Sequence, residues 1–126
     1  MLLTEYLSGI VKLIEEYSKT NLIASSELNN DFRTEHLGLI KGKIIFADES
    51  ILYFTEYLDL KDRVEKLTYS FHYQKQSGAL IFRYDNARHK PKLPFEYHRH
   101  WANGRIAKSK IPEFADVLEE IMEYLL

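Results

Sequence analysis

The sequence contains no cysteine, which excludes disulfide bonds, thiolate metal sites and a cysteine nucleophile. It also has no apolar run that approaches the length of a membrane span. The first residues, Met1 to Glu5, lack the positive charge that precedes the apolar segment of a signal peptide. We therefore expect a cytoplasmic protein with no membrane partner.

The motifs of several common enzyme classes are missing as well. There is no glycine-rich phosphate loop, no G-x-S-x-G nucleophile motif and no constellation of two carboxylates. These absences argue against nucleotide hydrolases, α/β-hydrolases and glycosidases. Proline and tryptophan are scarce, yet two of the three prolines and the only tryptophan lie within residues 82–104. Three of the five histidines lie there too, so this stretch is where we expect chemistry.

Positive charge is concentrated in the same part of the chain. Residues 83–110 contain eight lysines or arginines and only two acidic residues, whereas residues 112–126 contain five acidic residues and no basic one. A local positive field gathers anions such as phosphates. The alternative is a solvated basic loop balanced by an acidic helix, and charge alone does not choose between these interpretations.

Length and hydrophobic periodicity predict one α+β domain over residues 1–126. An amphipathic helix is expected over residues 4–19, with Thr4 as its N-cap. A second helix is expected after Ile111, with Pro112 at its first position. Strands are expected at residues 37–46, 51–60, 67–75, 79–86 and 95–101. Residues 22–24 and 32–36 are candidate strand segments, with a turn at residues 29–31 between them. Short connections favour an antiparallel meander of about five or six strands between the two helices.

The hairpin around Ser77-Gly78 fixes which residues share a face. A loop of two or four residues pairs apolar with apolar side chains, so Phe71, Tyr73, Phe82 and Tyr84 form the core face. On the opposite face His72 lies across from Arg83, and Ser70 lies across from Asp85. A three-residue loop would turn one strand over, and we prefer the even loops for that reason.

Residues 95–101 (FEYHRHW) alternate in the same way. If they form a strand, His98 and His100 project from one face together with Glu96. The loop through Pro91 and Pro94 is short enough for this strand to pair with residues 79–86.

Cleavage of RNA without a metal needs an acid–base pair that works near neutral pH and cations that stabilise the anionic transition state. His98 or His100 is the candidate acid or base, with His89 as partner and Arg83 as the cation. Asp85 shares the face of Arg83 and completes the catalytic set. The 2′-hydroxyl of RNA supplies the nucleophile, so this chemistry requires no cofactor.

RNA binding is expected to rest on the basic stretch and on aromatic stacking. The candidate residues are Arg88, Lys90, Lys92, Arg99 and Tyr84. Two alternatives use the same residues. In the first, the chain is a non-catalytic module that binds nucleic acid or a protein partner through the basic residues 83–110. In the second, His98, His100, His89 and Asp85 are ligands of a divalent metal in a metal-dependent nuclease. The oligomeric state is not fixed, and a homodimer is left open.

Four pieces of the C-terminal half resemble the TumE-like family of small toxin–antitoxin proteins. They are FRYDNARH (82–89), Pro94, HRHW (98–101) and DVLEEI (116–121). The family has a proline and two adjacent histidines after the alanine, where this chain has Arg88 and His89-Lys90. The resemblance implies the toxin of a type II toxin–antitoxin system, paired with a helix-turn-helix antitoxin and directed against RNA or translation.

Overall fold

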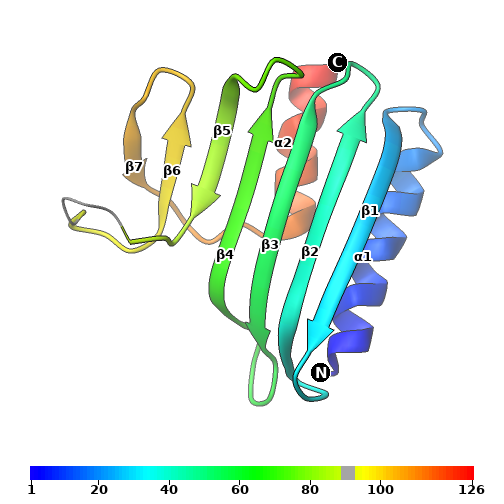
Figure 1. Cartoon of the computed structure of the whole chain (residues 1–126), viewed down its shortest axis with the longest axis vertical. Coiled ribbons are helices and arrows are strands. Elements are labelled where there is room, and N and C mark those ends of the chain that lie inside the picture. Colours follow the sequence, from blue (N-terminus) through cyan, green and yellow to red (C-terminus); the bar gives the residue numbers. More distant parts are fainter. Residues whose placement is uncertain (89–92) are drawn as a thin grey trace.

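The structure is a computed structural model that describes residues 1–88 and 93–126. Among these residues, two helices and seven strands follow one another in the order of Figure 1. They are α1 (Leu3–Ser18), β1 (Ile23–Phe32), β2 (Leu37–Phe46), β3 (Ile51–Asp59), β4 (Glu65–Gln74), β5 (Leu80–Asp85), β6 (His98–Trp101), β7 (Ile106–Lys108) and α2 (Phe114–Leu125).

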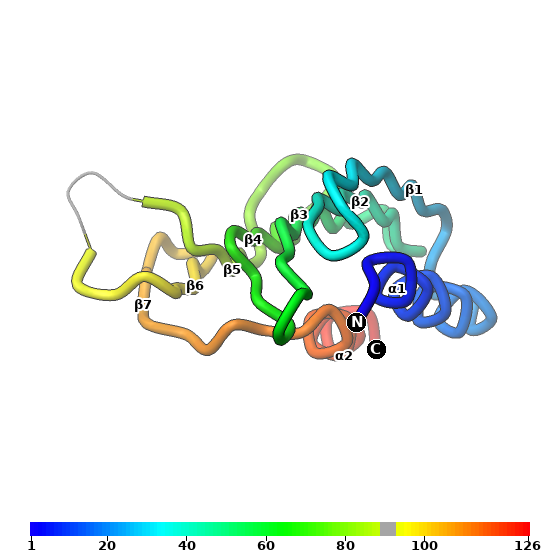
Figure 2. Tube along the Cα trace, turned by 90° about the horizontal axis from the view of Figure 1, so that it is seen from below, coloured from blue at the N-terminus to red at the C-terminus, as the bar shows by residue number. Residues whose placement is uncertain are grey.

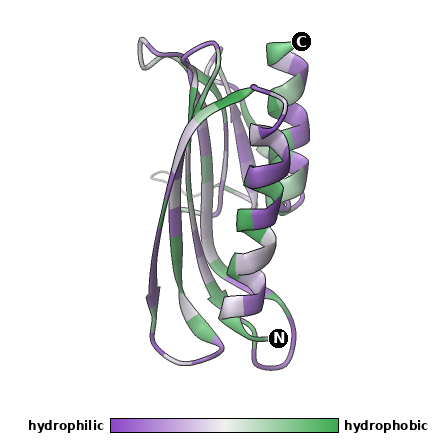
Figure 3. Ribbon diagram, turned by 90° about the vertical axis from the view of Figure 1, so that its right-hand side faces the viewer, coloured by the Kyte–Doolittle hydropathy of each residue, from purple (hydrophilic) through white to green (hydrophobic). Residues whose placement is uncertain are grey.

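The strands form one antiparallel sheet in sequence order, from β1 to β7. Both helices lie against the same face of this sheet, as Figures 2 and 3 show. The other face is left open. This confirms the predicted α+β meander flanked by an N-terminal and a C-terminal helix. The described strands number one more than the upper end of the prediction, because the short β7 was missed.

The core lies between the helices and the sheet because alternate strand residues are apolar. Ile40, Ile44 and Phe46 of β2 are fully buried. The apolar stripes of the helices close the core from the other side. The buried helix residues are Leu3, Ile10 and Ile14 of α1 and Phe114, Val117, Leu118, Ile121 and Met122 of α2. Each fully buried aliphatic side chain contributes about 1.5–3 kcal/mol of transfer free energy.

Three local expectations were wrong for identifiable reasons. Residues 29–31 do not turn, because they pair with residues 39–41 of β2, and the chain turns only after Phe32. There the hydroxyl of Thr34 accepts hydrogen bonds from the backbone N–H groups of His36 and Leu37. Helix α1 begins at Leu3 with Leu2 at the N-cap, so Thr4 is not the cap. Helix α2 begins at Phe114, with Glu113 rather than Pro112 before it.

In the β4–β5 hairpin the predicted residues share each face of the sheet, but the loop has a different length from the one expected. Phe71 pairs with Tyr84, and His72 pairs with Arg83. The loop holds three residues between Lys75 and Ala79, with Gly78 at a φ of 94°. A three-residue loop by itself would move every side chain of β5 to the other face of the sheet. The register shifts between Tyr73 and Gln74, and this β-bulge restores the predicted pairing.

Gly42 has a packing role in the centre of the sheet. It pairs with Phe54 across β2 and β3, and the phenyl ring of Phe54 lies over it. A Cβ atom at this position would lie 2.2 Å from the ring. Only glycine leaves room for Phe54 to fill the space between the sheet and the helices.

One ion pair is buried on the helix side of the sheet. Lys66 Nζ lies 3.0 Å from Glu56 Oε2, and the two side chains are 3% and 0% exposed. The same carboxylate oxygen accepts a 2.8 Å hydrogen bond from the hydroxyl of Tyr6 in α1. Lys66 also donates to the carbonyl oxygen of Pro112, just before α2. This polar cluster ties both helices to the sheet.

The sheet register places two rows of side chains side by side across the open face. The first row, called the arginine row, runs through Glu27, Lys43, Tyr53, His72, Arg83 and His100. The second, called the aspartate row, runs through Asn29, Lys41, Thr55, Ser70, Asp85 and His98.

Neither α1 nor α2, the helices of the described chain, is long and apolar enough to cross a membrane.

Candidate active site

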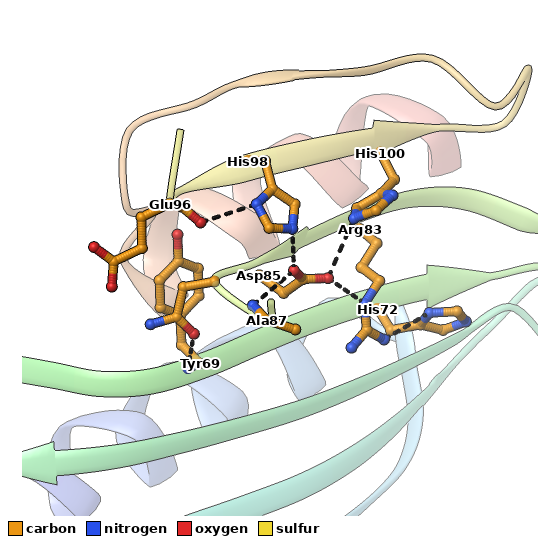
Figure 4. Close-up of polar contacts among 9 residues, drawn as sticks. Tyr69, His72, Arg83, Asp85, Ala87, Glu96, His98 and His100 are labelled. Atoms are coloured by element: carbon orange, nitrogen blue, oxygen red, sulfur yellow. Dashed lines mark hydrogen bonds and ion pairs between the residues drawn. The ribbon is translucent and has the colours of Figure 1, made fainter. Parts of the chain in front are cut away.

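Strands β5 and β6 bring the predicted catalytic residues together. Arg83 pairs with His100, and Asp85 pairs with His98. All four side chains lie on the open face, with His72 of β4 beside Arg83 (Figure 4). The alternation in β5 and β6 produces this arrangement, because every second side chain of a strand points to the same face. The expectation that the two strands pair is confirmed.

Asp85 is the centre of the cluster and is 2% exposed. Its Oδ2 accepts a 2.5 Å hydrogen bond from Arg83 Nε, and His98 Nε2 lies 2.5 Å from Oδ1. His100 Nε2 lies 3.4 Å from Oδ2, and the backbone N–H of Ala87 donates to Oδ1. One buried carboxylate thus orients three cationic or ionisable side chains.

Opposing influences act on the pKa of Asp85. Desolvation by burial raises it, whereas the hydrogen bond and charge of Arg83, the charge of His98 and the Ala87 N–H lower it. The lowering influences prevail, so the pKa of Asp85 lies below its ordinary value. Asp85 is therefore ionised at neutral pH and provides the negative charge of the site.

His98 is built into the protein rather than presented to solvent. It is 1% exposed, and its Nδ1 lies 2.9 Å from the carbonyl oxygen of Glu96. Its Nε2 faces Asp85, so both ring nitrogens face oxygen acceptors. The two contacts hold the ring in place between Glu96 and Asp85. This geometry suits a residue that positions Asp85 better than one that exchanges protons with a substrate.

His100 and Arg83 are the accessible members of the cluster, with side chains 17% and 34% exposed. Arg83 extends beyond Asp85, and its Nη1 lies 3.2 Å from Nδ1 of His72. The other ring nitrogen of His72 lies 3.0 Å from Gln74 Oε1. Because an arginine can only donate, His72 Nδ1 accepts and its Nε2–H donates to Gln74. His72 is therefore a neutral imidazole in this arrangement.

The pKa of His72 lies below its ordinary value. Burial lowers it most, the hydrogen bond to Gln74 raises it, and the charge of Arg83 lowers it further. The unfolded chain therefore binds this proton more readily than the folded protein does. The contribution of His72 to the free energy of unfolding is fully present above its ordinary pKa of 6.5. It is lost as the pH falls from that value through the lower pKa of the folded protein.

We expect the variant His72→Gln to be less sensitive to acid than the wild type. Glutamine does not titrate, so the fall in the free energy of unfolding between pH 7.5 and pH 5.5 should be smaller in the variant. Denaturant unfolding at both pH values measures the difference. Equal falls in both proteins would contradict the assigned protonation of His72.

A pocket of about 450 Å³ opens beside the cluster. It is lined by Thr55, Leu67, Thr68, Tyr69, Ser70, Arg83, Asp85, Asn86, Ala87, Arg88 and Glu96. Arg83 and Arg88 bring positive charge to its wall, and Asp85 and Glu96 bring negative charge. The pocket therefore gives an anionic substrate access to Arg83, whereas His72, His98 and His100 are not among its lining residues.

Tyr84 and Arg99, predicted to bind RNA, lie on the opposite face of the sheet. They pair with each other across β5 and β6 and face α2. There Tyr84 donates a 2.5 Å hydrogen bond to Glu120, and Arg99 forms a 2.8 Å ion pair with it. Burial and Glu120 raise the pKa of the Tyr84 hydroxyl to about 12. These contacts hold β6 on the helix, so the structure does not bring the two residues to the histidine cluster.

Of the four remaining predicted residues, the structure describes only Arg88. Arg88 is one of the residues that line the pocket. His89, Lys90 and Lys92 lie outside the described residues, and their assigned roles stay predictions. His72 is the functional candidate that was missed. The predicted register placed it opposite Arg83, and that was the available signal.

Asp85, His98 and His100 also form a candidate metal site. One ligand atom from each lies within 4.8 Å of the others. Zinc lies about 2.0–2.2 Å from nitrogen and oxygen ligands. The 2.5 Å contact between His98 and Asp85 leaves no room for an ion between those two atoms, and Arg83 occupies the second oxygen. Metal binding therefore requires the cluster to open, and the closed geometry fits an ion-paired cluster better.

Comparison with known proteins identifies a family for the chain. No curated protein and no solved structure matches the chain significantly. A family model described as "Toxin TumE" matches residues 10–125, which include every element from the body of α1 to the end of α2. The chain therefore belongs to the TumE toxin family, and this membership implies a toxin–antitoxin system with an antitoxin partner.

Proposed function

We propose that this toxin acts by cleaving RNA without a metal ion, at the cluster of His72, Arg83, Asp85 and His100. The observation that carries the proposal is the order of the arginine row. His72, Arg83 and His100 lie on three neighbouring strands, with the arginine between the two histidines. Two strand spacings separate the histidines by about 10 Å at the backbone, which leaves space for one phosphate group over Arg83.

The two histidines divide the proton transfers. His72 is neutral and takes the proton of the 2′-hydroxyl through Nδ1, once Arg83 turns from His72 to the phosphate. The 2′-oxygen attacks phosphorus while the bond to the 5′-oxygen breaks. His100 gives its proton to that leaving oxygen. The products are a 2′,3′-cyclic phosphate and a 5′-hydroxyl, and water is not consumed in this step.

Arg83 and Asp85 have different tasks in this scheme. The guanidinium of Arg83 stabilises the extra negative charge that develops on the phosphate oxygens, and its planar donors suit that geometry. Asp85 holds Arg83 at 2.5 Å and faces His100 at 3.4 Å, so it orients both. His98 positions Asp85 from the protected side. The proposal therefore assigns His98 to positioning and His100 to catalysis.

RNA in the cytoplasm is the proposed target, and a helix-turn-helix antitoxin is the proposed partner. Arg88 supports the first assignment, because it extends the positive wall of the pocket beyond Arg83. The second rests on the family's implied toxin–antitoxin organisation and stays a prediction for this chain. A basic pocket wall attracts phosphates before any specific contact forms.

The test is to express the wild type and Arg83→Ala from an inducible promoter, then measure growth and cleavage of total RNA with and without EDTA. The proposal expects toxicity and EDTA-insensitive cleavage by the wild type only. Cleavage abolished by EDTA would move Asp85, His98 and His100 to metal ligation. RNA left intact by a toxic wild type would contradict cleavage and favour a toxin that acts by binding.

A further inference from the structure

The open face of the sheet continues the candidate active site toward β1. In the arginine row, Arg83 is followed by His72, Tyr53 and Lys43 on successive strands. In the aspartate row, Lys41 lies beside Lys43 on β2. Three strand spacings separate Arg83 from Lys43, about 14 Å at the backbone. Lys41, Lys43 and Tyr53 lie outside the basic stretch 83–110.

Side-chain contacts link this row into one surface. The ring of Tyr53 lies 6.4 Å from the ring of His72, and Lys43 Nζ lies 5.8 Å from the centre of the Tyr53 ring. Tyr53 is nevertheless 40% exposed, in contrast to the buried Tyr69 and Tyr73 of β4. An aromatic ring is thus presented on the sheet with a cation on one side and the candidate active site on the other.

The helices leave this surface accessible. Both α1 and α2 cover the opposite face, as Figure 2 shows. A sheet face that combines exposed aromatic rings with lysines is suited to single-stranded RNA, because bases stack on the rings and phosphates meet the cations. A duplex keeps its bases stacked inside and offers no free base to Tyr53. Lysine is depleted in protein interfaces, so two lysines beside the ring favour RNA over a protein partner.

We propose that Tyr53, Lys43 and Lys41 form a binding track for single-stranded RNA that leads into the active site. The track deepens the proposed function, since it supplies the substrate strand next to the scissile phosphate. A base stacks on Tyr53. Lys43 and Lys41 contact the phosphates on the side of Tyr53 that is away from the active site. The track defines the substrate class as single-stranded RNA rather than duplex.

The experiment measures binding apart from cleavage. The probe is a fluorescein-labelled 2′-O-methyl RNA of mixed sequence, which lacks the nucleophilic hydroxyl, as a single strand and as a duplex. Fluorescence anisotropy gives Kd for the full-length wild type and for the variants Tyr53→Ala, Tyr53→Phe and Lys43→Ala. Matched controls are Tyr124→Ala and Lys12→Ala, which remove an exposed tyrosine and an exposed lysine from the two helices.

The track predicts that Tyr53→Ala weakens single-strand binding about 5-fold to 150-fold, the range for loss of one stacked base. Tyr53→Phe keeps the ring and should bind within about twofold of wild type. Lys43→Ala should weaken binding and reduce its salt dependence, because one phosphate contact is lost. The controls should bind as the wild type does, and the duplex more weakly than the single strand.

The outcomes separate this inference from the proposed function. Unchanged Kd in Tyr53→Ala and Lys43→Ala would overturn the track, even if the wild type cleaves RNA. Weakened binding in these variants supports the track, even if the wild type leaves total RNA intact. Loss of antitoxin binding in Tyr53→Ala with unchanged RNA binding would overturn the track and make this face a protein interface.

Discussion

Replacing His100 by alanine is expected to slow RNA cleavage about a hundredfold to ten-thousandfold, the usual cost of losing a proton-transfer group. The loss should fall on kcat, because His100 acts on the leaving oxygen and contributes little to holding the RNA. His72→Ala should cost a similar factor for the opposite proton transfer. Single-turnover cleavage of a labelled RNA measures both rates.

The matched control is His36→Ala. His36 lies between β1 and β2, where its Nδ1 contacts the carbonyl oxygen of Met1 rather than any residue of the cluster. It should cleave RNA at the rate of the wild type. The double variant His72→Ala, His100→Ala should lose less than the product of the single effects, since the two residues act on one step. Wild-type rates in a folded His100→Ala variant would exclude His100 from catalysis.

Replacing Lys66 by methionine is expected to lower the free energy of unfolding by about 3–5 kcal/mol, the range for breaking a buried ion pair on one side. The substitution leaves the carboxylate of Glu56 buried and without its cation, although Tyr6 still donates to it. It also removes the hydrogen bond to the carbonyl of Pro112. Denaturant unfolding of the wild type and the variant measures the loss.

Two further variants identify the cause of this destabilisation. Glu56→Gln combined with Lys66→Met removes both charges and keeps an acceptor for Tyr6, so it should recover much of the lost stability. Lys61→Met removes an exposed lysine and should change the free energy of unfolding by less than about 0.5 kcal/mol. A loss in Lys66→Met no larger than in Lys61→Met would contradict the buried pair.

The faces of the sheet follow from the sequence where apolar and polar residues alternate strictly. Between Phe71 and Asp85 aromatic and polar residues alternate, so every pairing that matches aromatic with aromatic residues puts Arg83 and Asp85 on one face, and the observed register is one of these pairings. The same reasoning places His98 and His100 on one face of β6. The chemical character of the site was therefore predictable, because a strand turned over by one residue would have buried Arg83 in the core.

Other features depend on contacts that no local pattern encodes. The polar residues 29–31 resemble a turn, and only pairing with β2 keeps them extended. Glu56 stands where the alternation expects an apolar residue, and its partner Lys66 comes from a neighbouring strand. His98 and His100 look equivalent in the sequence. Only the fold buries the first to 1% exposure and leaves the second at the edge of solvent.

The end groups of the RNA fragments test the central claim most directly. Purified toxin is incubated with a defined single-stranded RNA in EDTA, and the fragments are weighed by mass spectrometry. Proton transfer by two histidines to and from the RNA's own oxygens predicts 2′,3′-cyclic phosphate and 5′-hydroxyl ends. It also predicts that a 2′-deoxy nucleotide at the cleavage position blocks the cut. Fragments with 3′-hydroxyl and 5′-phosphate ends, formed only without EDTA, would contradict the account.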